Sequence, residues 1–201
     1  MRRRGKRGSA GSGVRQARRR GAGVTKVNNK MNHSTHFVPS DDQKREALLH
    51  VDYTIKQFAC AFLFLADSNI PKEQVVINAL IESIALHTRI LLDFFQASHR
   101  VEDDILSCDY DFPARPLELS GSIKDKVNKE AAHLTYGRIE RFVQGKKEWP
   151  YNEFVPQICQ RCIEFIDHVL ERHCEMFTDE ESKNWKVLRG MISKECDANS
   201  S

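Results

Sequence analysis

The amino-acid sequence predicts an all-α protein, a bundle of four to five helices that run alternately up and down. Three observations support this prediction. Apolar residues recur at helical spacing from about residue 41 to residue 195. No stretch alternates convincingly between apolar and polar residues, as a half-buried strand would. Signals for helix starts, such as Ser40 before two aspartates, separate the apolar stretches.

Each expected helix begins or ends at a local signal. Ser40 can cap the first helix, Pro71 suits the first turn of the second, and the sequence TDEE from Thr178 is typical of a helix cap. A long connection with two prolines and four aspartates separates the second helix from the third. The expected helices cover residues 41–66, 71–98, 122–144, 152–177 and 179–195.

The charge is divided unevenly along the chain. Residues 1–30 hold eleven Lys or Arg and no acid, whereas residues 31–201 hold 20 basic and 28 acidic side chains. We expect residues 1–36 to form a disordered basic tail, residues 37–195 the helical domain and residues 196–201 a polar tail. Two interpretations of the basic stretch stay open: an arm that binds nucleic acid, or a translation start placed too early, with Met31 as the true start.

The remaining composition indicates a reduced, cytoplasmic protein. The six cysteines are not preceded by an apolar signal-peptide core, so a secreted disulfide scaffold is not expected. Charged residues or His interrupt the apolar stretches before they reach about 18 residues, so no membrane span is expected. The acidic domain argues against a broad nucleic-acid groove.

The helix expected over residues 71–98 is apolar around almost its whole circumference, which predicts burial on most sides. Its polar exceptions form one narrow stripe, with His87 elsewhere among apolar positions. Arg89 and Asp93 are four residues apart and can pair, whereas Glu82 needs a partner from another helix. The stripe consists of Asn78, Glu82, Arg89 and Asp93.

The helix expected over residues 122–144 offers such partners. Charges next to its apolar stripe are costly unless they are paired, which predicts a cross-helix polar network. This network is either a structural device that fixes helix register or a polar cleft that binds or cleaves a substrate. The residues expected to join Glu82 are Glu130, Arg138 and Arg141, with His133 at the edge and Lys129 one turn before it.

The segments ALIESIALHTRILLDFF and VNKEAAHLTYGR resemble the HEPN superfamily of small helical bundles. The resemblance implies a metal-independent ribonuclease of the kind found in phage-defence and toxin–antitoxin systems, with a composite site at a homodimer interface. The family motif is an Arg followed by four to six residues and a His. His133 occupies the His position and would act as general acid or base, while Asn128 stands where the Arg is expected. Lys129 or Arg138 would then supply the positive charge.

Neither a metal nor a cofactor is expected. Cys159 and Cys162 form a CxxC pair, but both fall on the core-facing stripe of one helix, and His173 is about 16 Å further along. The acidic residues of the long connection lack the spacing of a calcium loop, which favours a solvated loop. These acids are Glu102, Asp103, Asp104, Asp109 and Asp111.

Two functional hypotheses follow. One is a HEPN-like ribonuclease that binds RNA and acts as a homodimer. The other is a non-enzymatic interaction module with a structural polar network. Neither a membrane nor a small-molecule cofactor is expected as a partner.

Overall fold

The computed structural model describes residues 37–97, 101, 103–119, 123, 126–127 and 149–198. All regular elements among them are helices, which confirms the prediction of an all-α protein. Of the helix expected over residues 122–144, only three residues are described. The elements are α1 (Asp41–Ala66), α2 (Gln74–Gln96), η1 (Ser107–Tyr110), α5 (Tyr151–Arg172), η3 (Cys174–Met176) and α6 (Asp179–Ala198), where η denotes a short 3-10 helix.

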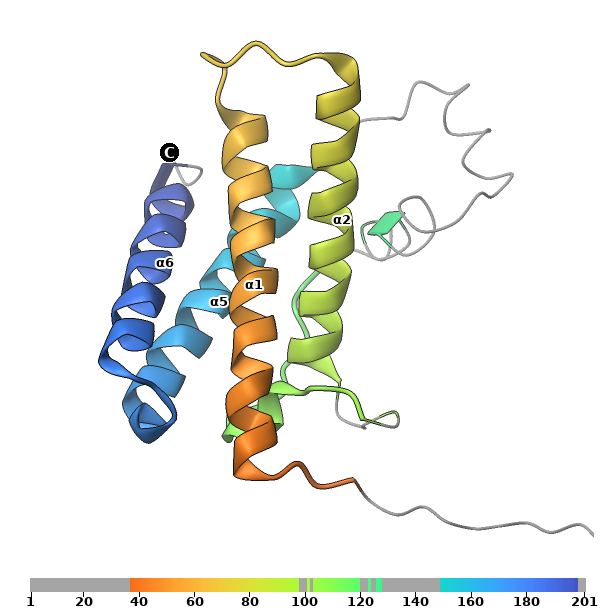
Figure 1. Cartoon of the computed structure of the whole chain (residues 1–201). Coiled ribbons are helices and arrows are strands. Elements are labelled where there is room, and N and C mark those ends of the chain that lie inside the picture. The colour runs from red at the N-terminus through yellow and green to blue at the C-terminus, as the bar shows by residue number, and fades with distance from the viewer. Residues whose placement is uncertain are drawn as a thin grey trace, which may run out of the picture. The chain divides into compact units, whose positions relative to one another are not determined.

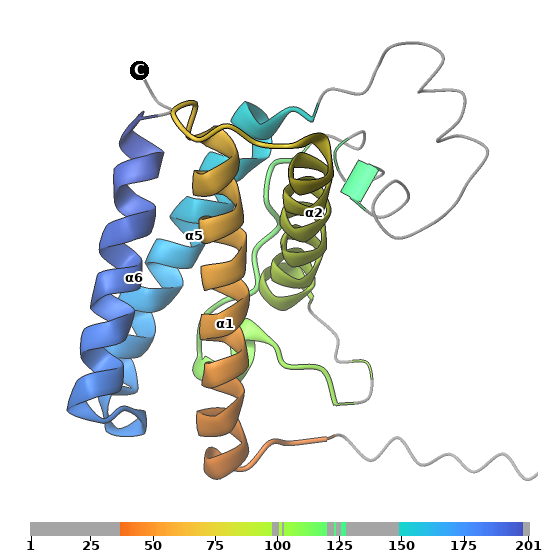
Figure 2. The same ribbon diagram turned by 45° about the horizontal axis from the view of Figure 1, so that its top comes forward.

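Two helix pairs build the described domain. α1 and α2 run antiparallel side by side, and α5 packs along α6 (Figure 1). Seen in both orientations, α5 crosses obliquely behind α1 (Figure 2). α5 touches α2 as well as α6, and α1 also reaches α6. α2 thus packs against α1 and α5 on one side, and its opposite side is called the outward face below.

Two helix starts are confirmed at the residues that the sequence indicated. The Ser40 hydroxyl accepts a hydrogen bond from the backbone N–H of Gln43, and the Gln43 side chain accepts one from the backbone N–H of Ser40. Thr178 and Glu181 form the same reciprocal pair at the start of α6. Each pair satisfies donors that the first turn of a helix leaves unbonded.

Two helix boundaries differ from the prediction. α2 begins at Gln74, so Pro71 precedes the helix and does not lie in its first turn. There Lys72 holds the turn in place, because its ammonium group donates to the backbone carbonyls of Asp67 and Ile70. α5 ends at Arg172 and not near residue 177, because the backbone leaves helical geometry at His173.

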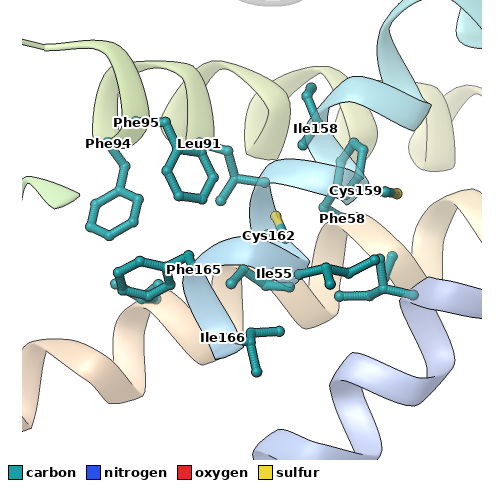
Figure 3. Packing of buried hydrophobic residues seen from close by; sticks show 14 of the residues in the cluster. Ile55, Phe58, Leu91, Phe94, Phe95, Ile158, Cys159, Cys162, Phe165 and Ile166 are labelled. Atoms are coloured by element: carbon teal, nitrogen blue, oxygen red, sulfur yellow. The ribbon is translucent and has the colours of Figure 1, made fainter. Parts of the chain in front are cut away.

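The core is built from aromatic and branched aliphatic side chains of α1, α2, α5 and α6 (Figure 3). Phe165 of α5 lies at its centre and meets Phe94 of α2 edge to face, with 5.0 Å between the ring centres. Ile123 and Val127, from the helix expected over residues 122–144, are also buried. Edge-to-face rings favour one arrangement over others, since the positive edge of one meets the negative face of the next.

The connection after α2 is fastened to the bundle over its described residues 103–119. Leu106, Tyr110 and Phe112 are buried, and the Tyr110 hydroxyl donates to the backbone carbonyl of Lys44 in α1, 2.8 Å away. The expectation of a solvated loop therefore holds only for its charges. Asp103, Asp104 and Asp111 are exposed, whereas Asp109 is half-buried.

Candidate functional site

The predicted catalytic group lies outside the described residues. The same is true of the residues expected to assist it, and of the charged residues expected to pair with Glu82. These residues are His133, Asn128, Lys129, Arg138, Glu130 and Arg141.

The predicted polar stripe of α2 faces outward. Asn78, Glu82 and Asp93 are exposed and Arg89 is half-buried. An exposed carboxylate such as that of Glu82 is solvated by water and carries no burial cost. The helix expected to supply its partners lies outside the described residues, so this pairing stays a prediction. Arg89 attracts Asp93 electrostatically along the helix.

His87 points away from this stripe, as expected. Its side chain is 8% exposed and meets Tyr53 of α1 edge to face, with 6.0 Å between the ring centres. Its Nδ1 atom is buried without a hydrogen-bond partner in the described part of the chain. Burial lowers the pKa of His87 below its ordinary value, since a protonated ring would lose hydration.

Apolar side chains lie between the charges on the same outward face of α2. Val75, Leu86 and Ile90 are 68%, 52% and 42% exposed. The expected burial of α2 on most sides is therefore wrong. On neighbouring α1, Leu49 and Tyr53 are each 57% exposed, and Tyr53 adjoins α2 through His87. The α1–α2 pair thus exposes large apolar groups that a core would normally bury.

Helices α1 and α2 are also long and apolar enough to cross a membrane, contrary to the expectation from their interrupting charges. This property concerns only length and composition. Both helices contribute many residues to the core, including Ile55 and Phe58 of α1 and Leu91 and Phe95 of α2. Core helices of soluble proteins meet the same criterion.

A cavity of about 540 Å³ opens between α1, the C-terminal half of α2 and residues 101 and 104–106 of the connection. Its walls are largely apolar. Asp93 is the member of the predicted polar stripe that lines it, together with Thr54 and His50 of α1, which the sequence did not single out. Thr54 follows His50 by four residues, so helical periodicity places both on one side of α1. Only the tertiary structure joins that side to Asp93.

A second polar region fastens the connection to α5. Arg161, which is 3% exposed, donates to the carboxylate of Glu164 over 2.9 Å and to the carbonyl of Pro113. Glu164 also binds the guanidinium of Arg115 at 2.9 Å. These contacts hold the pKa of Glu164 below its usual range, against the opposing effect of its partial burial. Arg161 and Arg115 already bind Glu164, so this region is structural, although Nε of Arg161 has no hydrogen-bond partner among the described residues.

Two histidines at the C-terminal end of α5 also hold the connection in place. Nε2 of His168 and Nε2 of His173 lie 2.8 and 2.9 Å from the backbone carbonyl of Tyr110. Because a carbonyl only accepts, both rings carry their proton on Nε2 in this arrangement. The sequence shows His173 only as a residue too far from the CxxC pair to share a metal, and its local pattern does not indicate this role. Among the described residues, no group of three or more His, Cys, Asp or Glu could hold a metal ion.

Cys159 and Cys162 are buried thiols, as their spacing on the core-facing stripe predicted. They are 3% and 1% exposed and belong to the core cluster.

No protein-family model, curated protein or solved structure matches the chain.

Proposed function

We propose that this chain is a HEPN-like interaction module that works as a homodimer, with the outward face of α2 as its two-fold interface. The observation that carries the proposal is the order of the exposed polar residues. Asn78, Glu82, Arg89 and Asp93 are separated by four, seven and four residues. This spacing reads the same in both directions, and its centre lies between residues 85 and 86.

Such a stripe is complementary to itself in an antiparallel arrangement. A two-fold axis at the centre places Glu82 of one copy level with Arg89 of the other, and the contact occurs twice. Asn78 similarly comes level with Asp93. An isologous interface requires this kind of self-complementarity, in which residue i meets j and j meets i.

Arg89 attracts Asp93 within one copy, but Glu82 has no such partner on its own helix. Glu82 and Arg89 are seven residues apart, which is about 10 Å along the helix. Leu86, which is 52% exposed, would meet its own counterpart near the axis and remove water from the flanking charge pairs. Val75 and Ile90 extend the apolar area along α2, and Leu49 and Tyr53 extend it onto α1. An apolar centre flanked by paired charges is the usual anatomy of an interface.

The test exchanges the two charges. Glu82→Arg and Arg89→Glu each create like-charge contacts across the axis, so each should weaken dimerisation at least about tenfold. The double variant restores opposite charges and should recover most of the affinity. Leu86→Glu should leave a monomer. Molar mass by sedimentation equilibrium, over a range of protein concentrations, measures all four.

Val187→Glu is the matched control, because Val187 is 65% exposed on α6, on another helix. Its dimerisation should equal that of the wild type. A monomeric wild type, or a double variant no better than the single ones, would reject this interface. Flotation of the monomer with lipid vesicles, lost in Leu86→Glu, would instead assign the face to a membrane.

The second candidate function is metal-independent RNA cleavage. The observation in its favour is the segment VNKEAAHLTYGR, with His133 between Lys129 and Arg138. The full-length chain should cleave RNA in the presence of EDTA, and His133→Ala should reduce the rate at least about a hundredfold, the size of a typical general acid or base contribution. If the active site is composite, Leu86→Glu should also abolish cleavage. If the folded dimer does not cleave RNA, the interaction role remains as the proposed function.

A further inference from the structure

The cavity between α1, α2 and residues 101 and 104–106 has the size and lining of a small-molecule site. Its volume of about 540 Å³ falls within the range of roughly 300–1,000 Å³ that is usual for ligand pockets. Val51, Leu91, Phe94 and Leu106 are buried core residues that form its apolar walls. A ligand with an apolar body would therefore displace water from apolar surface.

Two polar groups at this cavity are not engaged elsewhere. Thr54 is 9% exposed and lines the cavity, and its hydroxyl makes no hydrogen bond among the described residues. The carboxylate of Asp93 likewise has no hydrogen bond or ion pair within that part of the chain. By contrast, Arg161 and Glu164 of the other large described cavity, about 510 Å³ in volume, already bind each other. The Thr54 hydroxyl is open to the cavity, so it is available to a ligand.

We propose that this cavity binds a small organic amine in its protonated form. The ammonium group would donate hydrogen bonds to the Asp93 carboxylate and to the Thr54 hydroxyl oxygen. The hydrocarbon part would pack against Leu91, Phe94 and the other apolar walls. The site shares Asp93 and Ile90 with the outward face of α2, but it lies toward the C-terminal end of that helix, away from the two-fold centre at residues 85 and 86.

Other ligand classes fit the lining less well. A hard metal cation needs about six oxygen ligands, and the walls here are mostly hydrocarbon. An anion would meet the repulsion of Asp93 and of Asp104, which also lines the cavity. A neutral apolar molecule would exclude water from the Asp93 carboxylate without replacing its hydrogen bonds. An ammonium group supplies both charge and donors.

The electrostatics of Asp93 agree with this choice. Burial raises the pKa of Asp93 above its ordinary value; Arg89 counteracts this effect, and Asp104 adds to it. A cation beside Asp93 would offset both the lost hydration and the repulsion from Asp104.

The test uses phenethylamine as the probe, with 2-phenylethanol and 3-phenylpropionate as the neutral and anionic counterparts. Binding to the full-length protein is measured by NMR titration. The amine should saturate the site, and the alcohol and the acid should bind at least about tenfold more weakly, since a charge-assisted hydrogen bond contributes more than a neutral one. Asp93→Asn should weaken amine binding at least about tenfold, and Thr54→Val about threefold.

Glu171→Gln is the matched control, because Glu171 is an exposed acid on α5, and it should bind the amine like the wild type. Asp93 also belongs to the proposed two-fold contact, so the molar mass of each variant is measured and amine affinities are compared at the same oligomeric state. Circular dichroism checks that each variant is folded. Equal affinity for amine and alcohol, equal affinity of Asp93→Asn and wild type, or no saturable amine binding would each overturn the proposal, whatever the oligomeric state.

Discussion

Arg161 of α5 lies flat against Phe112 of the connection, with its guanidinium carbon 3.9 Å from the ring centre. The same guanidinium binds Glu164 and the carbonyl of Pro113. One buried cation thereby ties together two segments that are 48 residues apart. A buried charge is tolerable only with such partners, so its removal leaves Glu164 and a carbonyl without their donor.

We expect Arg161→Ala to lower the free energy of unfolding by about 3 kcal/mol, because it breaks a buried ion pair and a cation–π contact together. Urea unfolding followed by circular dichroism measures the change. Arg189→Ala is the control: Arg189 binds Asp167 at 2.7 Å, but both side chains are over 40% exposed. An exposed pair should cost less than about 1 kcal/mol. Equal losses in the two variants would contradict the structural role of Arg161.

The paired histidines should show coupling. His168 and His173 share one acceptor, the carbonyl of the fully buried Tyr110. Loss of either ring leaves the carbonyl one donor, whereas loss of both leaves it unsatisfied. The double variant His168→Ala/His173→Ala should therefore lose about 1 kcal/mol more than the two single variants added together. A double-mutant cycle in urea measures this coupling, and strict additivity would contradict the shared bond.

His87 should make stability depend on pH. Burial lowers its pKa in the folded state, so the unfolded chain takes up a proton more readily. Its stabilising contribution is complete above the ordinary pKa of 6.5 and is lost as pH falls below that value. Urea unfolding at pH 7.5 and pH 5.5 should show a larger loss in wild type than in His87→Gln. The same loss in both would mean that other groups cause the pH dependence.

Cysteine reactivity provides a test of the core. Cys159 and Cys162 are buried, whereas Cys60, Cys108 and Cys174 are exposed. A brief pulse of iodoacetamide on the native protein should label the exposed three and leave the buried two unmodified, because a buried thiol is inaccessible to the reagent. Peptide mass spectrometry reads the labelling. Addition of urea should make these five thiols, and Cys196, all react, and early labelling of Cys162 would contradict the packing of α5.

Sequence alone determined where several helices begin, because their caps are local. Ser40 and Gln43, like Thr178 and Glu181, are three residues apart, and their hydrogen bonds need no other part of the chain. Helical periodicity likewise identified Cys159 and Cys162 as core residues. Short-range chemistry and one-dimensional spacing were sufficient for these features.

Only the tertiary structure decided which side of α2 faces outward. Apolar residues surround almost the whole circumference of α2, so its sequence could not distinguish the buried Leu91 from the exposed Leu86. That choice depends on where α1 and α5 pack. The same holds for the connection, whose acids suggested a solvated loop, while Tyr110 is held by His168 from 58 residues away. Burial and long-range hydrogen bonds are properties of neighbours in space, and a local pattern does not specify those neighbours.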